Sequence, residues 1–342
     1  MKKYSVSNKD LLIFFVTTFG ITTLMGFLMS LVFSTNSVGA FPLVQMFYPA
    51  LGAMVALLLN KNLRNNVPKK FFITFISFAF FSIAYTLIKL FVFELDPEAD
   101  LVFIVLMMGC CLVAAYSSDK GERIEEFGLS FGKNFKESLR HIGLFVLLYL
   151  LTLLIGSSIE GDFIEFITPF IKPVTWGRIL LLPLAFLLNF PLMLGEEYGW
   201  RYFLQPALQE KLGKRKGIIL LGLIWGIWHL PINMFYYSPQ TSLHSVLNQL
   251  IVCTAYSIFF GYVYMKTENI WAISTIHFIN NSLGSLIYDA SGENVVFTWK
   301  AVVSNLVIMA LVYGPFLLTK VYRRDTDLEV NNIHSDISDI NQ

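Results

Sequence analysis

The chain has 342 residues, of which 55% are hydrophobic and only 14% are charged, and 32 of them are phenylalanine. This balance excludes an ordinary soluble domain and indicates an integral membrane protein, for which membrane lipids are the first expected partner. The formal net charge of +1 provides no overall attraction for nucleic acid, so no nucleic-acid partner is expected.

A membrane-spanning helix needs roughly 20 mainly apolar residues. Segments of this kind predict an all-α, polytopic membrane helix bundle with about ten transmembrane helices. In chain order they are 11–33, 41–59, 71–93, 101–116, 142–158, 179–203, 217–235, 246–265, 270–288 and 301–319. The first is too long for a cleaved signal peptide and lacks a small-residue cleavage site, so we expect it to remain as a helix.

Lysine and arginine are enriched in the cytoplasmic loops of membrane proteins. If the N-terminus is inside, 20 of the 25 basic residues fall on the cytoplasmic side, and only Lys172, Arg178 and Lys300 fall on the other side. Lys89 and Arg201 make up the remainder and lie within helices. The distribution therefore predicts that both termini are inside, in what we expect to be a bacterial plasma membrane.

Four regions follow from these patterns. Residues 1–116 are expected to form a four-helix membrane scaffold. Residues 117–141 mix charges with phenylalanine and leucine, which predicts an amphipathic elbow at the cytoplasmic interface. Residues 142–320 hold the remaining spans and every intramembrane charge except Lys89, so they are expected to form the catalytic membrane domain. Residues 321–342 form a polar tail that is expected to be disordered.

Ionisable side chains inside a membrane cost roughly 2.5–3.5 kcal/mol each and therefore mark function by default. Glu197 and Arg201 are four residues apart on one helix face, which predicts a structural ion pair. Glu196 points about 100° away from Glu197 on an ideal helix and has no such partner within its own helix. It is the candidate general base.

Two histidines accompany these carboxylates on later helices. His229 shares a helix face with Trp225, and His277 shares one with Asn281. From the rise of a helix, Glu196, His229 and His277 lie roughly 20, 18 and 11 Å from the cytoplasmic ends of their helices. Three antiparallel helices would therefore bring them to similar depths, in a cavity expected to open to the cytoplasm.

These residues resemble the motifs of the CPBP family, the CAAX-protease and bacteriocin-processing (Abi) intramembrane endopeptidases, which include the type II CAAX prenyl endopeptidases. "EEYGWR" from Glu196 is similar to EExxxR, "WGIWH" to FxxxH with Trp225 in place of Phe, and "HFINN" to HxxxN. The resemblance covers residues 127–288. It implies that Glu196 activates a water, that His229 positions this water, and that His277 and Asn281 stabilise the oxyanion.

Members of this family have also been called metalloproteases. A zinc site would need about three nitrogen or oxygen ligands and a water, and Glu196, His229 and His277 could supply them. The chain has no HExxH motif, and Asn281 suits a hydrogen-bond donor better than a ligand. We favour a metal-free peptidase that acts on peptides or membrane proteins, with zinc as the alternative.

Two other classes of function remain open at this stage. Buried Glu, Arg and His also suit a proton-coupled transporter, although no pair of interrupted helices recurs in both halves. A non-proteolytic membrane protein that confers bacteriocin immunity is the second alternative, because a fold does not determine activity.

Overall fold

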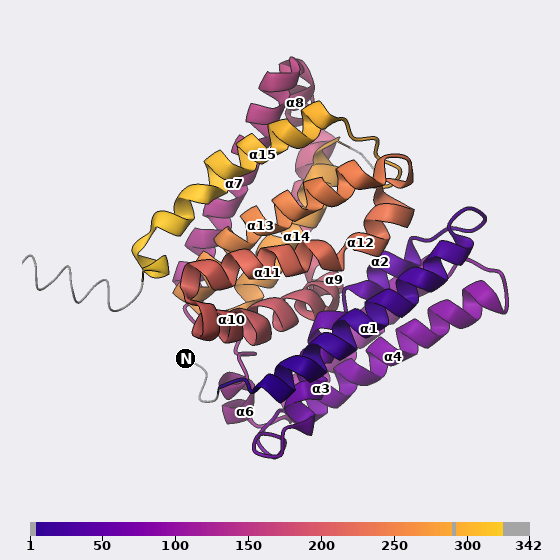
Figure 1. Cartoon of the computed structure of the whole chain (residues 1–342), viewed down its shortest axis with the longest axis vertical. Helices are drawn as coiled ribbons and strands as arrows, with labels where there is room; N and C mark the ends of the chain where they lie inside the picture. The colour runs from indigo at the N-terminus through magenta and orange to yellow at the C-terminus, as the bar shows by residue number, and fades with distance from the viewer. Residues whose placement is uncertain (1–4, 289–291, 324–342) are drawn as a thin grey trace, which may run out of the picture.

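The computed structural model describes residues 5–288 and 292–323, and within these ranges it contains helices and turns but no β-strand (Figure 1). This finding confirms the all-α membrane bundle. Of the predicted polar tail, 321–342, the residues from 324 onward lie outside the described ranges. The helices of the first half are α1 Asn8–Val32, α2 Ala40–Gln45, α3 Tyr48–Leu59, α4 Lys69–Phe91, α5 Glu98–Ser118, α6 Gly121–Glu126, α7 Phe135–Glu160 and α8 Phe163–Ile171.

The second half of the chain contains the site. Its helices are α9 Pro173–Glu197, η1 Tyr198–Leu204, α10 Gln205–Leu212, α11 Lys214–Trp228, α12 Leu230–Ile232, η2 Asn233–Tyr237, η3 Pro239–Thr241, α13 Ser242–Thr267, α14 Ile270–Tyr288, α15 Trp299–Tyr313, η4 Gly314–Leu318 and η5 Lys320–Tyr322. In Figure 1, α11, α13 and α15 lie in one group and α1, α3 and α4 in another.

Fewer helices qualify as membrane spans than the ten that were predicted. Among the described residues, eight helical segments are long and apolar enough to cross a membrane. A ninth counts if Lys214–Trp228 and Leu230–Tyr237, which meet at a bend of 45°, form one span. The segment that falls short is α14. It is helical over the predicted range, but His277, Asn280 and Asn281 lower its hydropathy.

The chain from Pro173 to Leu212 forms one continuous helical element of 40 residues. Its first part, α9, contains Pro183 and Pro191, each of which removes a backbone hydrogen bond and favours a bend. Directly after Glu197 the helix widens into the π-helical turn η1. π-Helical turns are rare in proteins, and those that occur are often found at functional sites. Here the turn changes the direction of the side chains that follow the two glutamates.

The N-terminal helices touch the backbone that carries these glutamates. A Cβ atom at Gly195 would collide with the carbonyl oxygen of Met46, and one at Gly199 would collide with the backbone of Pro49. Only glycine allows two backbones to approach this closely. The contacts therefore hold the end of α9 against the residue that follows α2, and the turn η1 against α3. The region expected to be a scaffold thus also helps to position the site.

The segment 117–141, predicted as an elbow, is tied to the two helices that carry the candidate site. The Tyr198 hydroxyl donates to the carbonyl of Phe127 at 3.0 Å, and Trp271 Nε1 donates to the carbonyl of Leu129 at 2.7 Å. One partner lies in η1 and the other in α14. The elbow therefore links the turn after Glu197 to the start of α14.

The bundle has two ends, which we call the N-terminal end, where α1 begins, and the far end. At the N-terminal end Lys211 Nζ donates to Asn8 Oδ1 at 2.7 Å, which brings the end of α10 beside the start of α1. At the far end the backbone N–H of Asn294 donates to the carbonyl of Tyr236 at 3.2 Å. The loop after α14 and the end of α11–η2 therefore meet there.

Candidate active site

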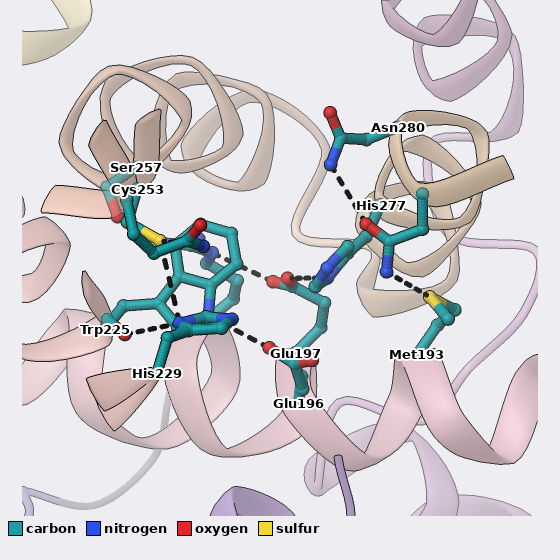
Figure 2. A network of polar contacts seen from close by, with 12 residues as sticks. Met193, Glu196, Glu197, Trp225, His229, Cys253, Ser257, His277 and Asn280 are labelled. Atoms are coloured by element: carbon teal, nitrogen blue, oxygen red, sulfur yellow. Dashed lines mark hydrogen bonds and ion pairs between the residues drawn. The ribbon is translucent and has the colours of Figure 1, made fainter. Parts of the chain in front are cut away.

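A cavity of about 750 Å³ reaches into the bundle between α7, α9, α11, α13, α14 and α15. Its volume is in the range typical of ligand sites. All four residues predicted to be catalytic line it, namely Glu196, His229, His277 and Asn281. They come from three separate segments of the chain, and Figure 2 shows their surroundings from close by.

Glu196 lies near the end of α9 and is 3% exposed. Its Oε2 accepts a hydrogen bond from Trp225 Nε1 at 2.9 Å (Figure 2). The sequence analysis expected a carboxylate without a partner in its own helix, and the partner found here is on α11. Because the indole is a neutral donor, it orients the carboxylate without forming an ion pair with it. The Trp225 bond therefore does not neutralise the Glu196 carboxylate, which can accept a proton in the cavity.

Glu197 points away from Glu196 into a different set of contacts. Its Oε2 accepts from Arg201 Nε at 2.9 Å, and both side chains are fully buried. Arg201 Nη1 donates to Ser257 Oγ at 3.1 Å, and its guanidinium lies 4.9 Å from the centre of the Trp225 ring. Glu197 and Arg201 thus form the expected ion pair, and α13 contributes a further acceptor to it.

The second oxygen of Glu197 holds one of the histidines. His277 Nδ1 lies 2.6 Å from Glu197 Oε1 (Figure 2). A carboxylate can only accept, so Nδ1 carries the proton and Nε2 is the nitrogen left for the cavity. The arrangement of a carboxylate behind a histidine orients the ring and is common in catalytic sites. The spacing predicted only the pair of Glu197 with Arg201, and the contact with His277 was not predicted.

His229 stands where α11 ends and the chain bends. Its Nδ1 lies 2.8 Å from the carbonyl oxygen of Trp225, which is four residues earlier. Because a carbonyl only accepts, Nδ1 carries the proton and the neutral ring has an acceptor at Nε2. Asn233 Nδ2 donates to the carbonyl of His229 at 2.9 Å, and Ser245 Oγ donates to Asn233 Oδ1 at 2.6 Å. These bonds hold the bend on which the orientation of the ring depends.

Asn281 lies one turn after His277 on α14, as its spacing predicted. Its Oδ1 accepts from Asn280 Nδ2 at 3.0 Å, and its Nδ2 lies 4.0 Å from Met193 Sδ. Contact with a thioether is weak, so this amide group can turn toward a stronger acceptor. Asn280 also lines the cavity. Two neighbouring amides can therefore reach a bound peptide.

The three residues proposed as zinc ligands each have a partner within the protein. Glu196 accepts from Trp225, His277 faces Glu197, and His229 faces a backbone carbonyl. Across residues 5–288 and 292–323, no group of three or more His, Cys, Asp or Glu side chains is arranged to hold a metal ion. In both histidines the bonded atom is Nδ1, which leaves Nε2 for a ligand, so zinc stays the alternative to the metal-free site.

Trp225 is the site residue that sequence analysis undervalued. From the sequence it was placed on the helix face of His229 and was the aromatic residue that replaces Phe in FxxxH, and no bond to Glu196 was predicted. In the structure its ring also lies 5.4 Å from the ring of His277 and 5.9 Å from that of His229. A signal was present, because tryptophan adds to the motif a ring N–H that phenylalanine lacks.

The cavity reaches the surface at the far end of the bundle. Its lining there includes Gly39, Glu98, Glu160 and Gly292, of which Glu160 and Gly292 are exposed. We call these four residues the mouth. An N-terminus on the cytoplasmic side would place the mouth on the opposite side of the membrane. The two expectations, an inside N-terminus and an active site open to the cytoplasm, therefore conflict for this cavity.

Residues 175–283 match the model of the family described as Type II CAAX prenyl endopeptidase Rce1-like. The matched segment contains all three motifs, and the match confirms the resemblance seen in them. It indicates a protease, and the apolar helices indicate that the protein is embedded in a membrane. Comparison with curated proteins and with solved structures found no match.

Proposed function

We propose, from the prenyl-endopeptidase match and the geometry of the cavity, that this protein is a glutamate-dependent intramembrane peptidase. It would hydrolyse peptide bonds of membrane-associated or lipid-proximal polypeptides. The observation that carries this proposal is that the two adjacent glutamates have different surroundings. Glu197 is neutralised behind the site by Arg201, while Glu196 lines the cavity beside His229 and His277.

In the proposed reaction, Glu196 is the general base. Its carboxylate takes a proton from a water molecule as the water oxygen attacks the carbonyl carbon of the substrate. His229 Nε2 accepts a hydrogen bond from the same water and holds it in place. As the carbon–nitrogen bond breaks, Glu196 returns the proton to the leaving amine. The products are a carboxylic acid and an amine, and the glutamate ends in its starting state.

His277 and Asn281 are proposed to stabilise the tetrahedral intermediate. A donor aimed at a developing oxyanion is worth about 3–4 kcal/mol. Among the described residues, Asn281 Nδ2 contacts the distant sulfur of Met193, and it can donate to the oxyanion instead. His277 Nε2 donates when the ring carries two protons. The carboxylate of Glu197 at 2.6 Å supports that charged form.

The buried charges balance in this proposal. Glu196 and Glu197 contribute two negative charges, and Arg201 with a protonated His277 contributes two positive ones. Balanced groups lower the cost of keeping charge in a membrane. Glu197 and Arg201 are therefore positioning residues, which hold His277 and the turn η1 without touching the substrate.

The test is cleavage of a quenched-fluorescent peptide library by purified protein in nanodiscs. Glu196→Gln keeps the shape of the side chain and removes the base, so the turnover rate should fall by about 10²–10⁴-fold. Glu122→Gln, on an exposed side chain of α6, is the matched control and should be as active as the natural protein. Full activity in Glu196→Gln would rule out this base.

Adding a metal chelator to the same assay tests whether catalysis needs a metal ion. The metal-free reaction proposed here should continue at its full rate in the presence of a chelator. Loss of activity with the chelator, and its recovery with added zinc, would replace the proposal with a metal-dependent mechanism. If the natural protein cuts no member of the library, the bacteriocin-immunity alternative is favoured instead.

A further inference from the structure

The charges of the two ends of the bundle differ in sign. Segments at the N-terminal end, 5–10, 60–70, 118–140, 205–217, 266–269 and 318–323, hold 17 basic and eight acidic residues. Segments at the far end, 92–100, 160–178 and 292–300, hold three basic and eight acidic residues. Because lysine and arginine are retained in cytoplasmic loops, the N-terminal end faces the cytoplasm and the far end faces away from it.

The cavity follows this polarity. None of the described residues that line it belongs to the N-terminal-end segments, whereas the mouth lies at the far end. On the way from Glu196 toward the N-terminal end, every residue of η1 is buried. Water and substrate therefore have their route to Glu196 through the extracytoplasmic mouth.

The charge inside the cavity has the same sign as its mouth. Its lining contains Glu98, Glu160 and Glu196 and no lysine or arginine among the described residues, and the protonated His277 of the proposed mechanism is already paired with Glu197. Glu160 is exposed at the end of α7, and Glu98 stands at the start of α5. A cleft lined by charges of one sign concentrates the electrostatic field and attracts ligands of the opposite charge. The lining thus favours a cationic ligand over an anionic one.

The absence of lysine and arginine from the described lining also bears on which peptide bond is cut. A C-terminal carboxylate is best bound by a lysine or arginine side chain, and in this cavity it would lie near Glu98, Glu160 and Glu196 instead. An extended internal segment has no such charge, and its backbone can bond to amide side chains such as Asn280, Gln249 and Asn305, which line the walls. The cavity is therefore better suited to an internal segment of a polypeptide than to its C-terminus.

We propose that the substrates are polypeptide segments with lysine or arginine beside the scissile bond, and that they reach the site from the extracytoplasmic side. This proposal rests on the peptidase function proposed above. It adds the charge of the substrate and the side from which the substrate comes. Both follow from the mouth and the lining of one cavity.

The side is tested without reference to activity. In a variant whose three cysteines are replaced by alanine, Gly292→Cys marks the mouth and Lys136→Cys marks the N-terminal end. An impermeant maleimide added to intact cells should label the Gly292→Cys variant at once and the Lys136→Cys variant only after lysis. The reverse pattern would overturn the proposed side and leave the peptidase proposal intact.

The charge preference is tested in detergent, where both ends are accessible. Three quenched-fluorescent decapeptides that differ only in Lys, Gln or Glu beside the central bond are compared. The Lys peptide should have the lowest KM, and Glu160→Gln should raise that KM roughly two- to fivefold, as for an exposed ion pair. The KM of the Gln peptide should rise less than that of the Lys peptide, because its side chain carries no charge for Glu160 to attract.

Two outcomes separate this proposal from the peptidase function. Cleavage with a KM that does not depend on peptide charge, or that is lowest for the Glu peptide, would overturn the charge preference alone. A detergent sample that cuts none of the three peptides while the nanodisc library is also uncut would overturn the peptidase proposal itself. Glu122→Gln, at the other end of the molecule, is the control for a general effect of removing a carboxylate.

Discussion

Trp225 Nε1 donates to Glu196 Oε2 at 2.9 Å, although the two residues are 29 positions apart in the chain. The motif that Trp225 occupies has phenylalanine in the family that the chain resembles, and phenylalanine cannot make this bond. In this protein the carboxylate proposed as the base therefore has a fixed donor on one oxygen. Its orientation depends on α11 as well as on its own helix.

Removing this donor should reduce turnover while the fold is retained. A hydrogen bond to a charged group is worth about 1.5–3 kcal/mol, and the wet cavity can replace part of it. We therefore expect Trp225→Phe to lower kcat by about tenfold, at the low end of that range, with little change in KM. Steady-state kinetics of the purified protein checks this expectation.

Trp228→Phe is the matched control for that experiment. Trp228 also lines the cavity, but its Nε1 has no hydrogen-bond partner among the described residues. Its kcat should stay near that of the natural protein. A second readout is the indole N–H resonance of Trp225, which should move in Glu196→Gln more than the other five indole resonances. Equal kinetic losses in both tryptophan variants would contradict a specific role for Trp225.

The two histidines should differ in what they contribute to stability. His277 contacts the buried carboxylate of Glu197 on another helix, whereas His229 Nδ1 contacts a carbonyl of its own helix. His277→Ala leaves one oxygen of Glu197 without its partner, which costs about 1–3 kcal/mol. We expect both alanine variants to lose activity, but only His277→Ala to lower the Tm clearly. A Tm that falls equally in both would argue against this asymmetry.

The glycine before the two glutamates should tolerate no side chain. A Cβ at Gly195 meets the carbonyl oxygen of Met46, and a backbone atom cannot swing aside. Gly195→Ala should therefore cost about 1–3 kcal/mol as an overpacked contact and should displace Glu196. Gly177→Ala is the control in the same helix, because nothing lies within 4 Å of a Cβ there. Thermal unfolding and turnover of the two variants should separate them.

A pH effect is expected at the contact that holds the elbow. Lys133 Nζ lies 2.6 Å from Glu268 Oε2 and lowers the pKa of this carboxyl below its ordinary value of 4.5, against an opposing effect of burial. Since the pKa is lower in the folded protein, the contact stabilises it above pH 4.5. This contribution is lost as the pH falls through the folded value.

The size of this pH effect should be small. More than a third of each side chain is exposed, so solvent screening leaves the pair at the low end of about 0.2–1 kcal/mol. The fall in Tm between pH 7 and pH 4 should be slightly smaller in Glu268→Gln than in the natural protein. A larger fall in the variant would give the opposite sign and contradict the assignment.

Much of the site could be predicted because it is local. The Glu197–Arg201 pair joins residues one helical turn apart, and the same spacing relates His277 to Asn281, so periodicity was sufficient for both. The cost of burying charge in a membrane singled out these residues from an apolar chain. Within residues 5–288 and 292–323, at most nine spans qualify instead of the ten predicted, because α14 has the length of a span but contains polar side chains.

What composition and spacing determined by themselves is the class of the protein, the helical segments and the residues that carry chemistry. The tertiary structure alone decided that Trp225 holds Glu196, that Glu197 is shared between Arg201 and His277, and that the cavity opens at the acidic end. These features depend on the rotation of each helix about its axis, on the π-helical turn after Glu197 and on the close approach at Gly195. Such geometry is set by packing between distant segments, and the period of a single helix does not encode it.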